Sequence, residues 1–192
     1  MNKKDIIEFF DSCAADWDAE MIIDTDTVNF ILDKADIMQN SQVRDVACGT
    51  GVLFPFYFQR KVSEVTGVDI SSEMVKITKE KFPGIKVICA DAHSYDFGEN
   101  FSNVMIYNAF PHFTSPDTLI KNLTSFLIKG GRLTVAHGMS KEQIDKCHSD
   151  RAKNVSLALP EAETLKEMMQ NYLDVDIVIS DDKMYMVSGK KQ

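Results

Sequence analysis

Three short stretches of this 192-residue chain combine residue types that could bind a nucleoside. Gly49 and Gly51 follow an apolar run, and glycines at such a turn let a ligand lie against the backbone while the next helix offers free N–H groups. Asp69 ends a second apolar run, where a carboxylate can accept hydrogen bonds from both ribose hydroxyls. Asp91-Ala92 ends a third run and suits an adenine edge. The order of these stretches predicts one ligand crevice.

Histidines are the second group of residues that could do chemistry. His112 lies just past a predicted strand and His137 ends another, so we expect both to open onto the crevice. An imidazole with a pKa near neutrality can act as a general base. Alternatively, His112, His137 and His148 could converge on a metal ion, since imidazole is a common metal ligand. The third interpretation is a histidine that meets solvent or a satisfied hydrogen bond, and we expect His93 on a loop surface.

The elements that must position these residues alternate along the chain. Apolar spacing predicts strands over residues 43–47, 64–70, 85–89, 101–107, 132–137, 175–180 and 184–188, and helices over residues 3–11, 25–37, 52–60, 71–82, 116–128, 140–147 and 160–171. Such alternation indicates an α/β protein whose mostly parallel sheet has helices on both faces. Asp181-Asp182 is too short for a crossover, so the last two strands should form an antiparallel hairpin. Ligands of such sheets bind beyond the carboxyl ends of the strands.

Composition narrows the functional class. Hydrophobic residues make up 44% and charged residues 26% of the chain, which is typical of a globular domain and excludes disorder or coiled coil. The net charge of -8 disfavours a broad nucleic-acid surface. The four cysteines form no C-x-x-C pair, and no apolar run is long enough for a membrane span. We therefore expect a single cytoplasmic domain over residues 1–192 with no membrane or nucleic-acid partner, and we leave the oligomeric state open.

The chain resembles the class I S-adenosylmethionine-dependent methyltransferases. Residues 45–51 look like the first motif of that family, although glycine is usual where Ala47 stands, and Leu127–Leu133 is similar to the turn before the fifth strand. The resemblance implies a single Rossmann-like three-layer sandwich, a seven-stranded sheet and S-adenosylmethionine as cofactor. It places cofactor contacts at Trp17, Asp45, Ala47, Cys48, Gly49, Gly51, Asp69, Ile70, Met74, Asp91, Ala92 and Asn108.

The resemblance also suggests how the ends of the chain are used. Residues 1–37 are similar to the lid helices of small-metabolite members, where Trp17 could close over the cofactor or simply cap the core edge. Residues 138–160 are the expected substrate cover. We therefore expect methyl transfer to a small molecule, with His112 and His137 as catalytic candidates. The alternatives are methylation of a macromolecule, a non-catalytic cofactor- or metal-binding module, and a nicotinamide dehydrogenase. Phe54 disfavours the dehydrogenase, since it stands where that fingerprint needs its third glycine.

Overall fold

A computed structural model describes residues 2–192 and contains one seven-stranded sheet with the order β3-β2-β1-β4-β5-β7-β6. The strands are β1 (Gln42–Val46), β2 (Glu64–Asp69), β3 (Lys86–Cys89), β4 (Phe101–Tyr107), β5 (Leu127–His137), β6 (Asp174–Ser180) and β7 (Tyr185–Lys190). Strands β1 to β5 pair in parallel, and β7 pairs antiparallel with both β5 and β6. The predicted Rossmann-like α/β fold and its closing hairpin are confirmed.

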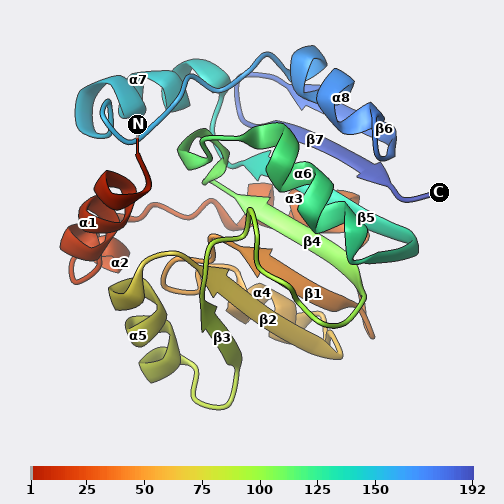
Figure 1. Ribbon diagram of the computed structural model, residues 1–192, viewed down its shortest axis with the longest axis horizontal. Helices are drawn as coiled ribbons and strands as arrows, with labels where there is room; N and C mark the ends of the chain where they lie inside the picture. Colours follow the sequence, from red (N-terminus) through yellow and green to blue (C-terminus); the bar gives the residue numbers. More distant parts are fainter. Residues whose placement is uncertain (1) are drawn as a thin grey trace.

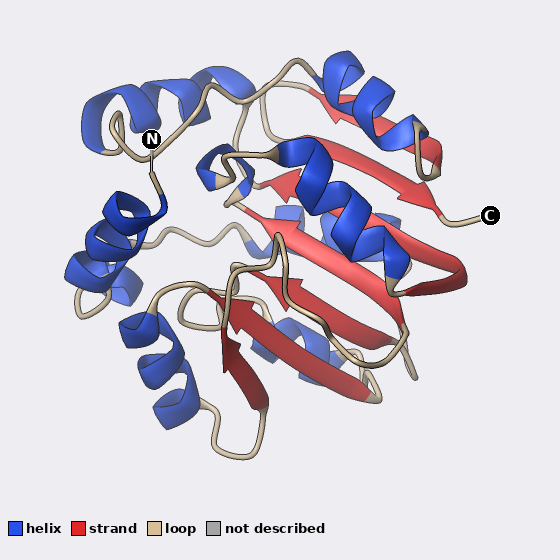
Figure 2. Cartoon of the chain, in the orientation of Figure 1, coloured by secondary structure: helices blue, strands red, loops and turns tan. Residues whose placement is uncertain are grey.

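Helices cover both faces of the sheet and its carboxyl edge (Figures 1 and 2). They are α1 (Lys3–Cys13), α2 (Trp17–Glu20), α3 (Thr25–Lys34), α4 (Phe54–Gln59), α5 (Ser72–Lys81), α6 (Pro116–Ser125), α7 (Lys141–Arg151) and α8 (Ala162–Gln170), with a short 3-10 turn, η1 (Phe110–His112). Figure 1 shows α1, α2 and α7 beyond the carboxyl ends of the strands. These three helices therefore lie where the ligand of such a sheet would bind.

Two apolar layers hold the helices on the sheet. Because side chains alternate across a strand, neighbouring residues of one strand enter different layers. Val104 and Ile106 of β4 pack in the layer that contains α6 and α8, whereas Met105 packs in the layer with α3 and α4. A third, small cluster joins Ile6 of α1 to Ala152 and Val155 after α7. That cluster ties the N-terminal helices to the expected substrate cover.

Several element boundaries differ from the sequence prediction by a few residues, and the largest difference is at the start of β5. The helix expected over residues 116–128 ends at Ser125, and β5 already begins at Leu127. Leu127 pairs with Phe101 of β4, and the strand resumes its register at Arg132 after an irregularity around Gly130, which has φ +77°. Cross-strand pairing therefore outweighs the helical spacing of the apolar residues. Across the part of the chain that the structure describes, no helix is both long and apolar enough to cross a membrane.

Candidate functional site

The turn after β1 is built from left-handed backbone conformations. Ala47, Gly49 and Gly51 have φ values of +56°, +54° and +83°. A Cβ atom on Gly51 would lie 2.8 Å from the Phe82 ring, so packing and backbone both require glycine there. A Cβ on Gly49 would meet only the indole Nε1 of Trp17, at 3.8 Å. The turn at Gly49 is thus open on the side that faces α2.

Asp69 joins this turn to the one after β2. Its Oδ2 accepts the N–H of Gly49 at 2.8 Å, and its Oδ1 accepts the N–H of Ser71 at 2.9 Å. The side chain is 8% exposed, and this burial raises its pKa above the usual value, although the backbone hydrogen bonds oppose the shift. Asp69 therefore stands, fixed in place, at the position expected for the ribose-binding carboxylate.

Asp91 already has partners at the end of β3. Lys3 of α1 lies 2.9 Å from Oδ2, and His93 Nδ1 lies 2.8 Å from Oδ1. Burial alone would raise the pKa of Asp91, but the hydrogen bonds from Lys3 and His93 lower it to about 2. His93 was expected on a loop surface, and this is wrong, because its ring is mostly buried and packs 5.4 Å from Phe113. Ala92 is buried, and its carbonyl accepts Asn122 Nδ2 at 2.9 Å.

Two predicted cofactor residues turn their side chains away from the open turn. Asp45 is 2% exposed and lies beside Tyr57; burial raises its pKa to about 8, with the nearby Asp69 adding to the shift. Cys48 packs against Gly67 and Phe54 in the layer beneath the sheet. A ligand at the turn can therefore meet these two residues only through their backbone, because each side chain is committed to the core.

Three further predicted cofactor residues lie just after β2, in α5 and just after β4. Met74 of α5 is buried at 1% exposure, whereas Ile70 is half-buried against the α1 cluster. Asn108 is exposed at the end of β4 with φ +54°, and its Oδ1 accepts the N–H of Gly138 at 3.0 Å. Asn108 thereby links the carboxyl ends of β4 and β5. His112 follows β4, and His137 is the last residue of β5.

Helices α1 and α2 are fastened over the crevice by polar contacts. Asp11 accepts the hydroxyl of Ser71 at 2.5 Å and the N–H of Glu73 at 3.2 Å, at the start of α5. Asp18 accepts the hydroxyl of Thr50 at 2.5 Å and Lys81 Nζ at 2.6 Å. The N-terminal segment thus lies over the glycine turn, as a lid would.

His112 sits under the same segment. Its Nδ1 lies 2.9 Å from the carbonyl oxygen of Val155, and its ring meets Phe10 edge-on at 4.8 Å and His148 at 4.9 Å. Burial lowers the pKa of His112 to about 4, although the Val155 hydrogen bond opposes the shift. The imidazole is therefore neutral at physiological pH.

His137 lies deeper, at the end of β5. It is 1% exposed, and burial lowers its pKa to about 3, with His148 and His112 contributing. Its Nε2 and His148 Nδ1 are buried without a hydrogen-bond partner among residues 2–192. The three histidines are thus neighbours. Within that described range, however, no group of three His, Cys, Asp or Glu residues is arranged to hold a metal ion, so the metal interpretation gains no support.

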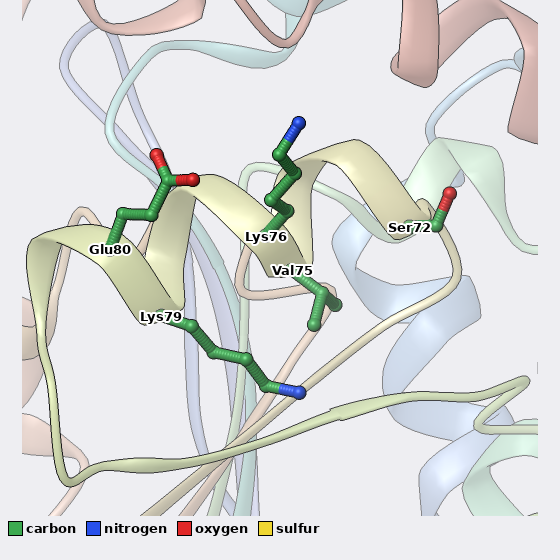
Figure 3. A pocket seen from close by; sticks show the side chains of 5 residues that line it. All are labelled: Ser72, Val75, Lys76, Lys79 and Glu80. Carbon is green, nitrogen blue, oxygen red and sulfur yellow. The ribbon is translucent and has the colours of Figure 1, made fainter.

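Two surface pockets lie away from these residues. One, of about 380 Å³, lies along α5 and is lined by Ser72, Val75, Lys76, Lys79 and Glu80 (Figure 3). The other, of about 290 Å³, lies at the amino ends of β4 and β5 and includes Arg132, whose guanidinium is already paired with Asp36 and Asp176. Neither pocket contains the glycine turn or the histidines. The candidate site is therefore defined by the glycine turn, Asp69 and the histidines, which lie next to the N-terminal helices.

Comparison with known proteins points to one family. Residues 43–131 match the family model described as a methyltransferase domain. An uncharacterized methyltransferase from Alkaliphilus oremlandii is 25% identical over 137 residues, which are 67% of this chain and 63% of that protein. A demethylmenaquinone methyltransferase from Paenarthrobacter aurescens is 29% identical over 107 residues, or 55% of this chain and 42% of that protein. The chain thus spans less than two thirds of the length of these relatives.

Solved structures share the fold over nearly the whole chain. A TehB-like SAM-dependent methyltransferase from Corynebacterium glutamicum matches with a TM-score of 0.68 at 14% identity, covering 100% of both chains. A chain from the Haloferax volcanii complex of the Trm112 methyltransferase activator with a methyltransferase matches with a TM-score of 0.80 at 16% identity, covering 97% of each.

The fold and the glycine turn define a Rossmann-like cofactor-binding protein. With the matches above, residues 43–131 form a methyltransferase domain, and the chain shares its fold with S-adenosylmethionine-dependent methyltransferases of known structure. The family implies S-adenosylmethionine as the cofactor, and the residues present fit it. Gly49 is open on one side, and Asp69 is held beside it by the Gly49 N–H.

Proposed function

We propose that this protein transfers a methyl group from S-adenosylmethionine to a small molecule. The observation that carries the proposal is the Gly49 turn, whose N–H is bonded to the buried Asp69 carboxylate and whose open side faces Trp17. When bound, the cofactor supplies a methyl group on a positively charged sulfur, which is an excellent leaving group. The protein must therefore mainly orient the acceptor, exclude water and receive a proton.

Each part of the cofactor has candidate partners. The Asp69 carboxylate can accept hydrogen bonds from the ribose hydroxyls, and the rest of the cofactor can lie against the backbone of the turn, where Gly49 carries no side chain. Asp91 is the proposed contact of the adenine edge. This contact requires that Lys3, which is paired with Asp91, moves away. Trp17 would close over the turn from α2, since its indole nitrogen already faces Gly49. Ile70, Met74, Ala92 and Asn108 would line the surrounding rim.

His112 and His137 are the proposed catalytic residues. Both follow strands whose ends flank Asn108, and burial keeps both imidazoles neutral. A neutral imidazole retains a lone pair that can accept a proton from the methyl acceptor.

A small acceptor is favoured over a macromolecule by the lid. Helices α1 and α2 are held against α5 and the glycine turn through Asp11 and Asp18, and a small acceptor can pass such helices more easily than a folded polymer can. The acidic chain also disfavours a nucleic acid. The relative from Paenarthrobacter aurescens is a demethylmenaquinone methyltransferase, which is named for a small-molecule acceptor. The Haloferax neighbour, in contrast, assembles with an activator protein, so a partner of that kind is a second candidate.

The proposal is tested by titration and turnover. Calorimetry should show binding of S-adenosylmethionine to the wild-type chain and none to Gly49→Val with a native circular dichroism spectrum, because a side chain at Gly49 meets no core residue and projects toward Trp17. Cofactor with a labelled methyl group should then label compounds in a small-metabolite pool and leave protein and RNA fractions unlabelled. Binding without turnover would indicate a non-catalytic module, and labelled protein or RNA would indicate a macromolecular acceptor.

A further inference from the structure

Four rings form a continuous series from the glycine turn to the histidines. Trp17, beside Gly49, meets Phe10 at 5.7 Å; Phe10 meets His112 at 4.8 Å; and His112 meets His148 at 4.9 Å, each edge to face. We call these four residues the aromatic row. Phe10 is its second member and the ring that connects the cofactor turn with the proposed base. A molecule that bridges the same two places must therefore take the position of Phe10.

The hydrogen bond to Val155 decides which nitrogen of His112 is free. A carbonyl oxygen can only accept, so we infer that Nδ1 carries the hydrogen and donates it to Val155 across 2.9 Å, while the Ser156 hydroxyl oxygen, 3.2 Å from Nδ1, is a second acceptor. In a neutral imidazole, Nε2 then carries the lone pair. Val155 lies in the segment after α7, and its side chain packs with Ile6 of α1. The substrate cover therefore fixes His112 as a proton acceptor at Nε2.

The surroundings of this acceptor are apolar and uncharged. His112 faces Phe10 from α1, Val155 and Ser156 from the cover, and His148 from α7. His148 in turn faces Asp145, which Lys141 holds at 2.7 Å. Burial also lowers the pKa of His148 and His137. Among the side chains that the structure describes, those in contact with the His112 ring carry no fixed charge, so this position suits a neutral hydrogen-bond donor.

Two buried nitrogens nearby still lack partners among the described residues. They are Nε2 of His137, which is 1% exposed, and Nδ1 of His148. Leaving a buried polar group unpaired costs free energy, so a ligand that offers polar atoms here would remove that cost. These two nitrogens are independent evidence that polar atoms of a ligand bind at the histidine end of the aromatic row.

We propose that the methyl acceptor is a flat aromatic compound with an acidic hydroxyl, which displaces the Phe10 ring and gives its proton to Nε2 of His112. The inference rests on the proposed methyl transfer. As the acceptor oxygen, or a ring carbon that it activates, bonds to the methyl carbon, the carbon–sulfur bond breaks and sulfur keeps the electron pair. His112 receives the proton that the acceptor loses and later releases it to water. The row supplies edge-on contacts to the acceptor ring.

The acidity of the hydroxyl follows from the weakness of the base. A histidine held neutral by burial accepts a proton reluctantly. Its proton donor should therefore be a phenol-like hydroxyl rather than an aliphatic alcohol, because proton transfer becomes more favourable as the donor becomes more acidic.

The first experiment reads the tautomer in the free protein. With ¹⁵N-labelled histidine, long-range ¹H–¹⁵N spectra should show His112 as the Nδ1–H tautomer at pH 7, assigned by its absence in His112→Phe. The Nε2–H form would overturn the proposal. This measurement needs no cofactor, so its failure is distinguishable from a failure of methyl transfer.

The second experiment titrates two matched probes, 2-naphthol and 2-methoxynaphthalene, into protein saturated with S-adenosylhomocysteine. We expect 2-naphthol to bind more tightly and to shift His112 Nε2, and His112→Phe to abolish the preference. Phe10→Ala should tighten 2-naphthol binding about tenfold, because no ring must be displaced before the probe binds. Glu8→Ala, at an exposed position on the same helix, is the control and should leave the affinity unchanged. Equal affinities for the two probes, or no gain in Phe10→Ala, would refute the proposal.

Discussion

At the scale of single residues, Asp69 is the side chain on which the cofactor proposal depends most. Replacing it with Ala removes the acceptor for both ribose hydroxyls, and hydrogen bonds to a charged group contribute about 1.5–3 kcal/mol. We expect Asp69→Ala to weaken S-adenosylhomocysteine binding by that amount in calorimetry. Asp182→Ala in the exposed β6–β7 turn is the control and should bind normally. Unchanged affinity in a folded Asp69→Ala variant would remove the residue from the site.

Ala47 is a residue in a conformation that suits glycine better. Its φ of +56° costs about 1–2 kcal/mol for a residue with a Cβ, and glycine costs about 0.5–1 kcal/mol through its freedom in the unfolded chain. Ala47→Gly should therefore stabilise the protein by up to about 1 kcal/mol in urea unfolding. Ala90→Gly, at a position without positive φ, should instead destabilise it. A loss of stability in Ala47→Gly would show that the methyl packing outweighs the strain.

At the scale of elements, we expect the docking of α1 onto α5 to govern how fast the cofactor leaves, as it would if α1 and α2 act as a lid. Asp11 caps the start of α5 through Ser71 and Glu73, and loss of such a cap typically costs about 0.5–2 kcal/mol. We expect Asp11→Ala to release S-adenosylhomocysteine faster, because the lid opens more often. The single tryptophan, Trp17, lies on this lid and reports the release in stopped-flow fluorescence.

The control for this lid variant lies on the same helix. Glu8 is exposed and pairs only with Lys4, one turn away, so Glu8→Ala should leave the release rate unchanged. Equal release rates in Asp11→Ala and wild type would mean that α1 does not move when the cofactor leaves.

At the scale of the whole molecule, buried ionisable groups make stability depend on pH in both directions. His137 and His112 have pKa values of about 3 and about 4 in the folded protein, against 6.5 when exposed. Between pH 6.5 and about 4 the unfolded chain binds more protons, so stability falls as the pH falls. Urea unfolding at pH 7 and pH 5 should show this loss, and His137→Phe should reduce it. An unchanged pH dependence in that variant would contradict the burial of a neutral His137.

Asp45 acts in the opposite sense. Its pKa of about 8 in the fold, against 3.8 when exposed, means that the folded chain binds the extra proton between those values. Its contribution to stability is therefore lost as the pH rises from about 4 to 8. Asp45→Asn mimics the protonated acid and should flatten the decline between pH 6.5 and pH 8 in urea unfolding. If the stability of Asp45→Asn declines as steeply as that of the wild type, another group causes the decline.

The sequence by itself determined the fold and the ligand-facing turn. Alternating apolar periods specify strands and helices locally, and the glycines and Asp69 lie at strand ends whatever the packing. The wrong boundary near Leu127 has a physical reason, since pairing with Phe101 across the sheet outweighs a helical pattern within one segment.

Only the tertiary structure decided what the side chains meet. Asp45 and Cys48 stand in the recognised motif, yet both side chains are buried. The register of β1 sets the direction of the Asp45 side chain, whereas Cys48 follows the strand and packs in the layer of Phe54. Lys3 reaches Asp91, and Val155 fixes the tautomer of His112. These pairs are far apart along the chain, and no local pattern encodes them. Their contacts exist because the N-terminal helices and the segment after α7 pack together over the carboxyl ends of the strands.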